Sequence, residues 1–279
     1  MKAEFALNPA GRLKVYSAPR RSEEAPARID SFSPRTGRAA RDEPPSGSDA
    51  MNRYQRLRAL SAFHSCTLRS ARPDAFGGGE PVFGMRQSPI DIVPERVLPG
   101  AAPIEIRFEH DANFVRRTDH SLEVHFTEGS VLSRSGVVYR LHQLHFHTPA
   151  ETLLAGLPHP VETHFVFEGD LGCFLVVAAF MRAGRSNPAL RDLLAHVPDR
   201  FDAPSPFPSF DPHLLLPERL GHWAYTGSFT TPPYLEPVEW VVLKDEAEAS
   251  AEEISALEAL LGMNARPVQP MNGRTVRER

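Results

Sequence analysis

The sequence predicts a mainly β protein of the α+β class, with a largely antiparallel sheet and few helices. From about residue 81 onward, short runs rich in β-branched and aromatic residues alternate with turn signals. Several runs alternate apolar and polar residues at a period of two, which indicates antiparallel strands with two different faces. The runs cover 104–110, 121–129, 137–147, 160–169, 173–181 and 234–243.

Helical spacing occurs in residues 187–197 and 250–261. In the second segment, Ser250 stands three residues before Glu253, which is the pattern of a capping box. Residues 51–63 could form a short basic helix or remain a frayed extension. The prediction is therefore a sheet protein with peripheral helical pieces.

The first 50 residues are rich in Arg, Pro, Ser and Glu and show no periodicity, which predicts disorder. We divide the chain into a poorly ordered extension, 1–72, and a folded domain, 73–279. Residues 1–73 carry 14 Lys+Arg against 7 Asp+Glu, and residues 74–279 carry 17 against 28, so +7 and −11 sum to the net charge of −4. Arg supplies nearly all of the positive charge, which is typical of coding bias, and we predict no nucleic-acid binding.

Deletion of residues 1–50 is expected to leave activity and the thermal midpoint nearly unchanged, because this segment has no means of burying apolar surface. Activity and thermal unfolding of the shortened chain beside the full chain test this. A large drop in either quantity would show that the segment docks on the folded domain.

No run approaches the ~20 apolar residues of a membrane span, and Met1 is not followed by the apolar core of a signal peptide. This predicts a cytoplasmic protein, with a periplasmic or secreted location as the alternative if translation starts at Met51. Cys66 and Cys173 allow at most one disulfide. Because Cys173 lies in the apolar run CFLVVAAF, we interpret it as a small buried hydrophobic residue.

Histidines are concentrated in residues 139–167. His145 and His147 are two residues apart, so on a strand both side chains lie on one face, together with Gln143. A second strand-like run places His164 and Glu162 on one face. The alternative is that these are ordinary hydrogen-bonded or exposed histidines.

Three neutral imidazoles with one open position are typical of a catalytic zinc site. Gln143 and Glu162 each stand two residues before a histidine, and metal-bound histidines usually donate their other ring N–H to such an acceptor. The pattern therefore favours Zn²⁺ as the cofactor.

Taken together, the motifs resemble those of the α-class carbonic anhydrases, mostly of the bacterial type, over roughly residues 81–274. They occur in the family order: QSPIDI at 87–92, QLHFHTPAE and VETHFVF around the three histidines, GSFTTPP at 227–233, VEW at 238–240 and NARPVQPMNGR at 264–274. The resemblance implies the α-carbonic anhydrase fold, a large, twisted, mostly antiparallel central sheet with a few peripheral helices and the zinc at the bottom of a cone. We interpret QSPIDI and NARPVQPMNGR as structural segments.

The resemblance also implies a role for each site residue. The zinc ligands would be His145, His147 and His164, supported by the side chains of Gln143 and Glu162 and by the backbone carbonyl of Asn264. Thr230 would accept a hydrogen bond from a zinc-bound hydroxide and donate one to Glu151, and Thr231 would touch the bicarbonate. The apolar wall that holds CO2 would consist of Val166, Val176, Phe229, Val238 and Trp240.

The resemblance further assigns a proton shuttle to His120, in the segment RTDHSLEV. Asp119 and Glu123 could raise the pKa of His120. His125 is a weaker alternative, because a period of two places it on the opposite strand face from His120.

Three departures from the family pattern stand out. No Trp-Ser-Tyr or Trp-Gly-Tyr segment precedes Gln87, which puts the water network of the site in doubt. Tyr234 stands where secreted bacterial members often have a disulfide cysteine, and Phe229 replaces the usual Leu.

The implied function is reversible hydration of CO2 to bicarbonate and a proton by a zinc-bound hydroxide, with sensitivity to sulfonamide-type inhibitors. One alternative is a non-catalytic carbonic anhydrase-like binding module, although such relatives typically lose a zinc histidine. A second is a zinc hydrolase that acts on esters. A metalloprotease is disfavoured because the chain has no His-Glu-x-x-His motif, and the oligomeric state stays open.

Overall fold

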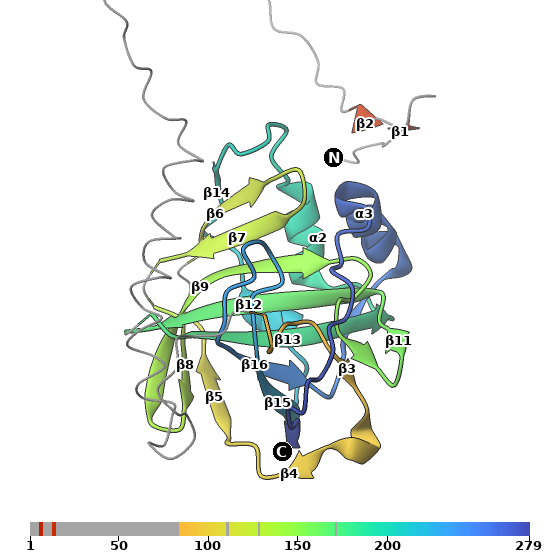
Figure 1. Cartoon of the computed structure of the whole chain (residues 1–279). Helices are drawn as coiled ribbons and strands as arrows, with labels where there is room; N and C mark the ends of the chain where they lie inside the picture. The colour runs from red at the N-terminus through yellow and green to blue at the C-terminus, as the bar shows by residue number, and fades with distance from the viewer. Residues whose placement is uncertain (1–5, 8–12, 15–83, 110–111, 128, 171) are drawn as a thin grey trace, which may run out of the picture. The chain divides into compact units, whose positions relative to one another are not determined.

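The computed structural model describes residues 6–7, 13–14, 84–109, 112–127, 129–170 and 172–279 (Figure 1). The chain divides into two units, Met1–Pro44 and Pro45–Arg279. In the first unit, strand β1 (Ala6–Leu7) pairs antiparallel with β2 (Leu13–Lys14). The rest of the predicted extension 1–72, with the possible helix at 51–63, lies outside the described residues.

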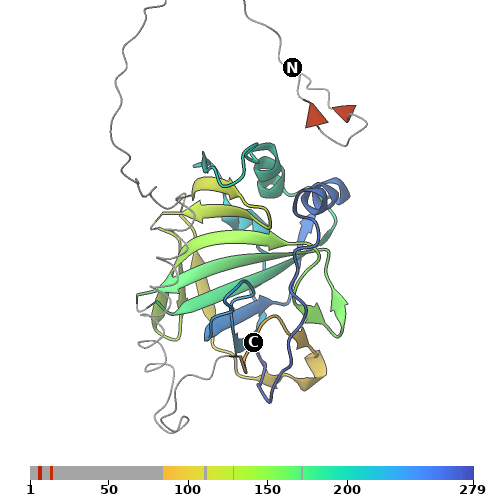
Figure 2. The same ribbon diagram turned by 45° about the horizontal axis from the view of Figure 1, so that its top comes forward.

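The second unit is built on one large sheet in which β14, β6, β7, β9, β12, β13, β16, β15, β18 and β4 follow one another, while β5, β8 and β17 pair beside this path (Figures 1 and 2). Most pairs are antiparallel, as predicted; the parallel pairs in this sheet are β13 with β16, β13 with β17, and β18 with β4. The strands of this sheet are β4 (Leu98–Pro99), β5 (Ile104–Arg107), β6 (Ala112–Arg117), β7 (Leu122–Phe126), β8 (Val131–Arg134), β9 (Val137–His147), β12 (Val161–Gly169), β13 (Phe174–Ala183), β14 (Ser205–Pro206), β15 (His222–Gly227), β16 (Val238–Leu243), β17 (Ala247–Ala249) and β18 (Arg277–Glu278). A smaller sheet contains β3 (Asp91–Ile92), β10 (Leu153–Leu154) and β11 (Leu157–Pro158).

Two α-helices, α2 (Pro188–Ala195) and α3 (Ala251–Leu261), lie at one end of the sheet (Figure 2). Ser250 and Glu253 form the predicted capping box at the start of α3. Two short 3₁₀ helices, η1 (Pro94–Arg96) and η2 (Pro212–Leu215), also occur among the described residues. Within the described residues, no helix is long and apolar enough to cross a membrane.

The central strands are buried on both faces, and their residues alternate between two apolar layers. On β12, Phe165 and Phe167 belong to the larger layer, whereas Val166 belongs to the smaller one. On β13, Val177 packs in the larger layer and Val176 in the smaller. This double burial explains why CFLVVAAF reads as a continuous apolar run rather than an alternating one.

The six predicted strand runs all contain strands, with some boundaries shifted by a few residues. Among the described strands of this unit, those that were not predicted are all six residues long or shorter, and the longest of them are β6, β15 and β8. The interpretation of Cys173 as a small buried hydrophobic residue is only partly correct, because the residue packs against the larger apolar layer but is not fully buried. Cys173 is partly exposed and disulfide-bonded, and the other cysteine, Cys66, lies outside the described residues.

Candidate metal centre

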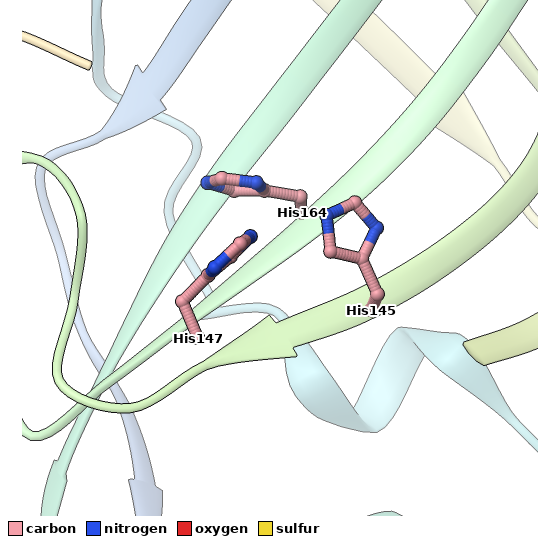
Figure 3. Close-up of side chains that lie close together, drawn as sticks. All are labelled: His145, His147 and His164. Carbon is pink, nitrogen blue, oxygen red and sulfur yellow. The ribbon is translucent and has the colours of Figure 1, made fainter. Parts of the chain in front are cut away.

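Three histidines from two adjacent strands converge on one point (Figure 3). His145 on β9 is the direct cross-strand partner of His164 on β12, and His147 lies one pleat further along β9. The ring centroids are 5.0 Å apart for His145 and His147, 5.2 Å for His145 and His164, and 4.4 Å for His147 and His164. One nitrogen from each ring lies within 4.8 Å of the other two, so the group could hold a metal ion.

Burial keeps two of these imidazoles neutral. It lowers the pKa of His145 to about 3, with the positive charge of a protonated His164 as a further cause. Burial and the same charge hold the pKa of His147 well below its ordinary range. Neutral imidazoles have a free lone pair at neutral pH, so these rings need not lose a proton before they bind a metal.

Polar side chains lie against two of the three rings, and the contact with His145 is a hydrogen bond. Gln143 Oε1 lies 3.0 Å from Nδ1 of His145, and Glu162 Oε1 lies 3.1 Å from Nε2 of His164. Glu162 also accepts hydrogen bonds from the backbone N–H (2.7 Å) and hydroxyl (2.8 Å) of Thr152. Burial would raise the pKa of Glu162, but the charge of His164 and these hydrogen bonds outweigh it and lower the pKa.

His147 is different, because neither of its ring nitrogens has a hydrogen-bond partner among the described residues although both are buried. The backbone of Asn264 lies beside this ring and opposes part of the lowering of its pKa. The Asn264 side chain instead donates to the backbone oxygen of Phe146 (3.0 Å) and accepts from the N–H of Thr148 (2.9 Å). Buried ring nitrogens without partners are what a metal ligand without its metal would show.

Glu151 and Thr230 lie next to the three histidines. Glu151 Oε1 is 3.4 Å from Nδ1 of His147 and accepts a hydrogen bond of 2.8 Å from the backbone N–H of Arg266. Burial raises the pKa of Glu151 to about 7, although Thr230 lies close enough to lower it in part. Oε2 of Glu151 has no hydrogen-bond partner with ordinary geometry among the described residues. Thr231, which follows Thr230 in the sequence, is exposed.

An apolar surface adjoins the histidines on the same sheet face. Val166 pairs with Val176, which pairs with Trp240, in one row across β12, β13 and β16. The Trp240 ring meets His164 edge-on at a centroid distance of 4.9 Å. Val238 is buried in the same layer, and Phe229 packs against it. The structure thus brings all five residues of the predicted apolar wall together beside the histidines.

The segments QSPIDI and NARPVQPMNGR, which we interpreted as structural, contact each other close to the residues that precede Thr230. Ser88, in the first, accepts hydrogen bonds at its Oγ from Tyr225 (3.1 Å) and from the backbone N–H of Ser228 (3.2 Å). Gln269, in the second, donates its backbone N–H to the oxygen of Pro89 at 2.8 Å. These segments therefore support the turn that carries Thr230.

Residues 80–279 match the family described as eukaryotic-type carbonic anhydrase. The chain belongs to this family. The membership confirms the resemblance and the predicted enzyme class, because the curated relatives also bear the name carbonic anhydrase.

Among those relatives, a carbonic anhydrase of Pectobacterium carotovorum is 33% identical over 195 residues, covering 69% of this chain and 80% of the relative. One of Neisseria gonorrhoeae is 35% identical over 199 residues, covering 70% and 78%. Both relatives are bacterial, in agreement with the predicted bacterial type.

Solved carbonic anhydrases share the fold. The α-carbonic anhydrase of Thermovibrio ammonificans, solved with the inhibitor sulfanilamide, has a TM-score of 0.67 and 34% identity over 70% of this chain and 87% of its own. The enzyme of Photobacterium profundum has a TM-score of 0.67 and 35% identity over 70% of this chain and 90% of its own. These matches confirm the predicted α-carbonic anhydrase fold.

His120, the predicted proton shuttle, lies in the turn before β7. Its side chain is 85% exposed and pairs with Asp119 at 3.0 Å between Nε2 and Oδ2. Its backbone oxygen accepts a hydrogen bond of 3.0 Å from the side chain of Asn264, which also contacts the backbone of Phe146 on β9 and of Thr148. Glu123 does not contact His120, but binds Arg116 (2.6 Å) and His125 (2.8 Å).

The reason given for setting His125 aside is wrong. Strand β7 begins at Leu122, so its period of two cannot be extended back to His120. The register pairs Glu123 with His145 and His125 with Gln143, which places both β7 side chains on the face of the metal centre. Burial would raise the pKa of Glu123, but the hydrogen bond from His125 and the charge of Arg116 lower it to about 2.

Proposed function

We propose that this chain is a zinc-dependent carbonic anhydrase that interconverts CO2 and water with bicarbonate and a proton. The observation that carries the proposal is the set of three converging imidazoles, two buried and one partly buried, lying between an apolar wall and a buried Thr–Glu pair. The wall includes Trp240, and the pair is Thr230 with Glu151. The family membership supports the same reaction.

The donor set fits zinc, because imidazoles bind a metal as neutral ligands, so three of them would leave the ion its full charge and one open position. When bound, zinc lowers the pKa of a coordinated water from about 15.7 to about 7, the figure long known for carbonic anhydrases. Gln143 and Glu162 would hold the rings of His145 and His164 in the required orientation. His147 would use one of its unpartnered ring nitrogens.

Thr230 would orient the attacking water. A threonine hydroxyl both donates and accepts hydrogen bonds, so it can accept from the water while it donates to an ionised Glu151. The unpartnered Oε2 of Glu151 is available for that bond, and Oε1 is held by the Arg266 amide. With its proton committed to Glu151, Thr230 would leave one lone pair of the water oxygen directed at the substrate.

The apolar wall suits CO2, which is uncharged and has no hydrogen to donate. Val166, Val176 and Trp240 present hydrocarbon and indole surface next to His164. Such a wall binds a gas weakly and leaves its carbon open to attack, whereas a charged clamp would favour the bicarbonate product. Phe229, bulkier than the usual Leu, packs against Phe174 at a centroid distance of 4.9 Å and would narrow this pocket.

The alternative of a non-catalytic binding module is weakened by the convergence of all three histidines. Metal analysis combined with CO2 hydration, with and without an aromatic sulfonamide, separates the candidates. We expect about one zinc per chain and hydration that the sulfonamide inhibits. Zinc without sulfonamide-sensitive hydration would favour the binding module, and ester hydrolysis without CO2 hydration would favour the hydrolase.

The disulfide at Cys173 bears on the compartment. Disulfides persist in oxidising compartments and are rare in the cytosol, so we now favour the periplasmic or secreted alternative. Fractionation of the host cell tests this, and recovery of the protein from the cytosol would contradict it.

His120→Ala is expected to lower kcat in dilute buffer while leaving kcat/KM nearly intact, because His120 would carry the proton out of the site. A group of pKa ~7 takes up a proton from water with a diffusional rate constant of ~10¹⁰ M⁻¹s⁻¹. Multiplied by its acid dissociation constant of ~10⁻⁷ M, this gives a rate of about 10³ s⁻¹ for direct release of the proton to water. A faster enzyme needs a relay with a pKa near 7. Stopped-flow kinetics at several buffer concentrations measure the effect, and added imidazole should restore kcat.

His125→Ala is the matched variant, since the structure places this ring on the site face. We expect His125→Ala to lower kcat in dilute buffer less than His120→Ala does. A loss in His125→Ala without one in His120→Ala would transfer the shuttle role to His125. If neither variant lowers kcat in dilute buffer, the shuttle assignment is wrong.

A further inference from the structure

Tyr234 ends the turn Thr231–Tyr234, which directly follows Thr230. Its backbone N–H donates to the oxygen of Thr231 at 2.9 Å, closing the turn. Its φ of 60° lies in the left-handed region, which is uncommon for a residue with a large side chain. Such a conformation persists only where the surroundings hold it, so the contacts of Tyr234 matter for the whole turn.

The main contact of the Tyr234 side chain is the guanidinium of Arg266. The guanidinium carbon lies 3.7 Å from the centroid of the Tyr234 ring, close enough for a stacked cation–π contact. Nη1 of the same guanidinium donates to the backbone oxygen of Ser88 at 2.6 Å. The backbone oxygen of Tyr234 accepts a bond of 3.2 Å from Gln87. The stack is therefore anchored on both sides.

The same Arg266 reaches the metal centre through its backbone. Its N–H donates to Oε1 of Glu151 at 2.8 Å. Because Oε2 of Glu151 has no partner with hydrogen-bond geometry among the described residues, this amide is the firmest hold on the carboxylate. Glu151 in turn lies beside Thr230. A closed ring results, from Thr230 along the turn to Tyr234, across to Arg266 and back through Glu151.

We propose that the Tyr234–Arg266 stack is a positioning pair, which fixes the carboxylate of Glu151 relative to the hydroxyl of Thr230. This inference rests on the proposed function, because Thr230 and Glu151 act there as one unit. Neither residue of the pair belongs to the three histidines, to the Thr230–Glu151 unit or to the predicted apolar wall. It acts through the Arg266 amide on one side and through the Thr230 turn on the other.

The stack predicts which substitutions are tolerated. Tyr234→Phe keeps a flat ring under the guanidinium, whereas Tyr234→Leu keeps an L-residue of similar backbone preference but removes the ring. Arg266→Lys keeps the positive charge and the backbone N–H but loses the planar group. We expect the first variant to behave like the wild type and the other two to be impaired.

Two measurements test this on the zinc-loaded and the metal-stripped protein. The first is hydrogen–deuterium exchange of residues 264–268, which reports the Arg266 amide. In Tyr234→Leu and Arg266→Lys we expect faster exchange there and a loss of about tenfold in kcat/KM for CO2 hydration, at unchanged zinc content, because small misplacements of a catalytic group are costly. Phe201→Leu is the control, since Phe201 forms a comparable stack with Arg117 at 4.6 Å but is remote from this ring of contacts in sequence.

The outcomes separate the claims. If hydrogen–deuterium exchange of residues 264–268 in Tyr234→Leu equals that of the wild type, the stack does not hold the Arg266 amide. A Tyr234→Phe variant as impaired as Tyr234→Leu would also contradict a role for the stacked ring. Faster exchange with unchanged kcat/KM would reduce the pair to a purely structural role and overturn the positioning proposal. If the wild type itself does not hydrate CO2, the proposed function fails, and the exchange of the metal-stripped protein alone then decides whether the stack holds the Arg266 amide.

Discussion

Replacing His147 with Ala is expected to abolish CO2 hydration and to weaken zinc binding strongly, while the fold survives. Two imidazoles cannot complete the site, because zinc in such centres is held by three protein ligands. The fold should survive because, in the part of the chain that the structure describes, neither ring nitrogen of His147 has a partner with hydrogen-bond geometry, so truncation breaks no described side-chain hydrogen bond.

Zinc content after dialysis, CO2 hydration and thermal unfolding together measure this. In the metal-free state, variant and wild type should unfold within about 10 °C of each other, since a typical buried truncation costs about 1–3 kcal/mol and each kcal/mol moves the midpoint by about 2–4 °C for a domain of this size. His213→Ala, an exposed histidine on η2, is the control and should keep zinc and activity. Unchanged zinc in His147→Ala would refute the assignment of this ligand.

The grouping of the three histidines could be predicted because it depends only on the strand period and on one pairing of neighbouring strands. The strand period of two places His145 and His147 on one face whatever the rest of the fold does. The meeting with His164 needed only that the next apolar run pair beside the first, which neighbouring strands in sequence commonly do. The supports Gln143 and Glu162 follow from the same period, since each stands two residues before its histidine.

Residues far apart in sequence could not be placed in this way. The contact of Arg266 with Glu151 spans 115 residues, and that of Arg266 with Ser88 spans 178. No periodicity links such segments, so QSPIDI and NARPVQPMNGR could be interpreted only as structural. In the structure, the two segments contact each other, and Ser88 also contacts Ser228, two residues before Thr230.

The prediction of the strand face on which His125 lies was wrong for a different physical reason. A period of two holds only within a continuous strand, and the turn at Thr118 to Ser121 interrupts the strand before β7. A register shift between β9 and β12 at Val166 and Phe167 shows the same limit, because one extra residue changes which side chains share a face. Sequence alone does not mark where such interruptions fall.

Thr230→Ala is expected to retain zinc but to lose roughly 10²-fold in kcat/KM, the usual scale for removing one preorganised hydrogen-bonding group. Without the hydroxyl, the attacking water would keep its nucleophilicity but lose its fixed orientation. Thr230→Ser should recover much of the activity, because it restores the hydroxyl without the methyl group. Zinc analysis beside the kinetics separates this loss from a loss of metal.

Glu151→Gln tests whether the two residues act as one unit. The amide can still accept from the Arg266 N–H, which now binds Oε1 of Glu151, but it is no longer an ionised acceptor for Thr230. We expect a loss similar to or smaller than that of Thr230→Ala. The double variant should be little worse than Thr230→Ala alone, since residues that act together lose their contribution together. Losses that add in the double variant would show that Thr230 is oriented by something other than Glu151.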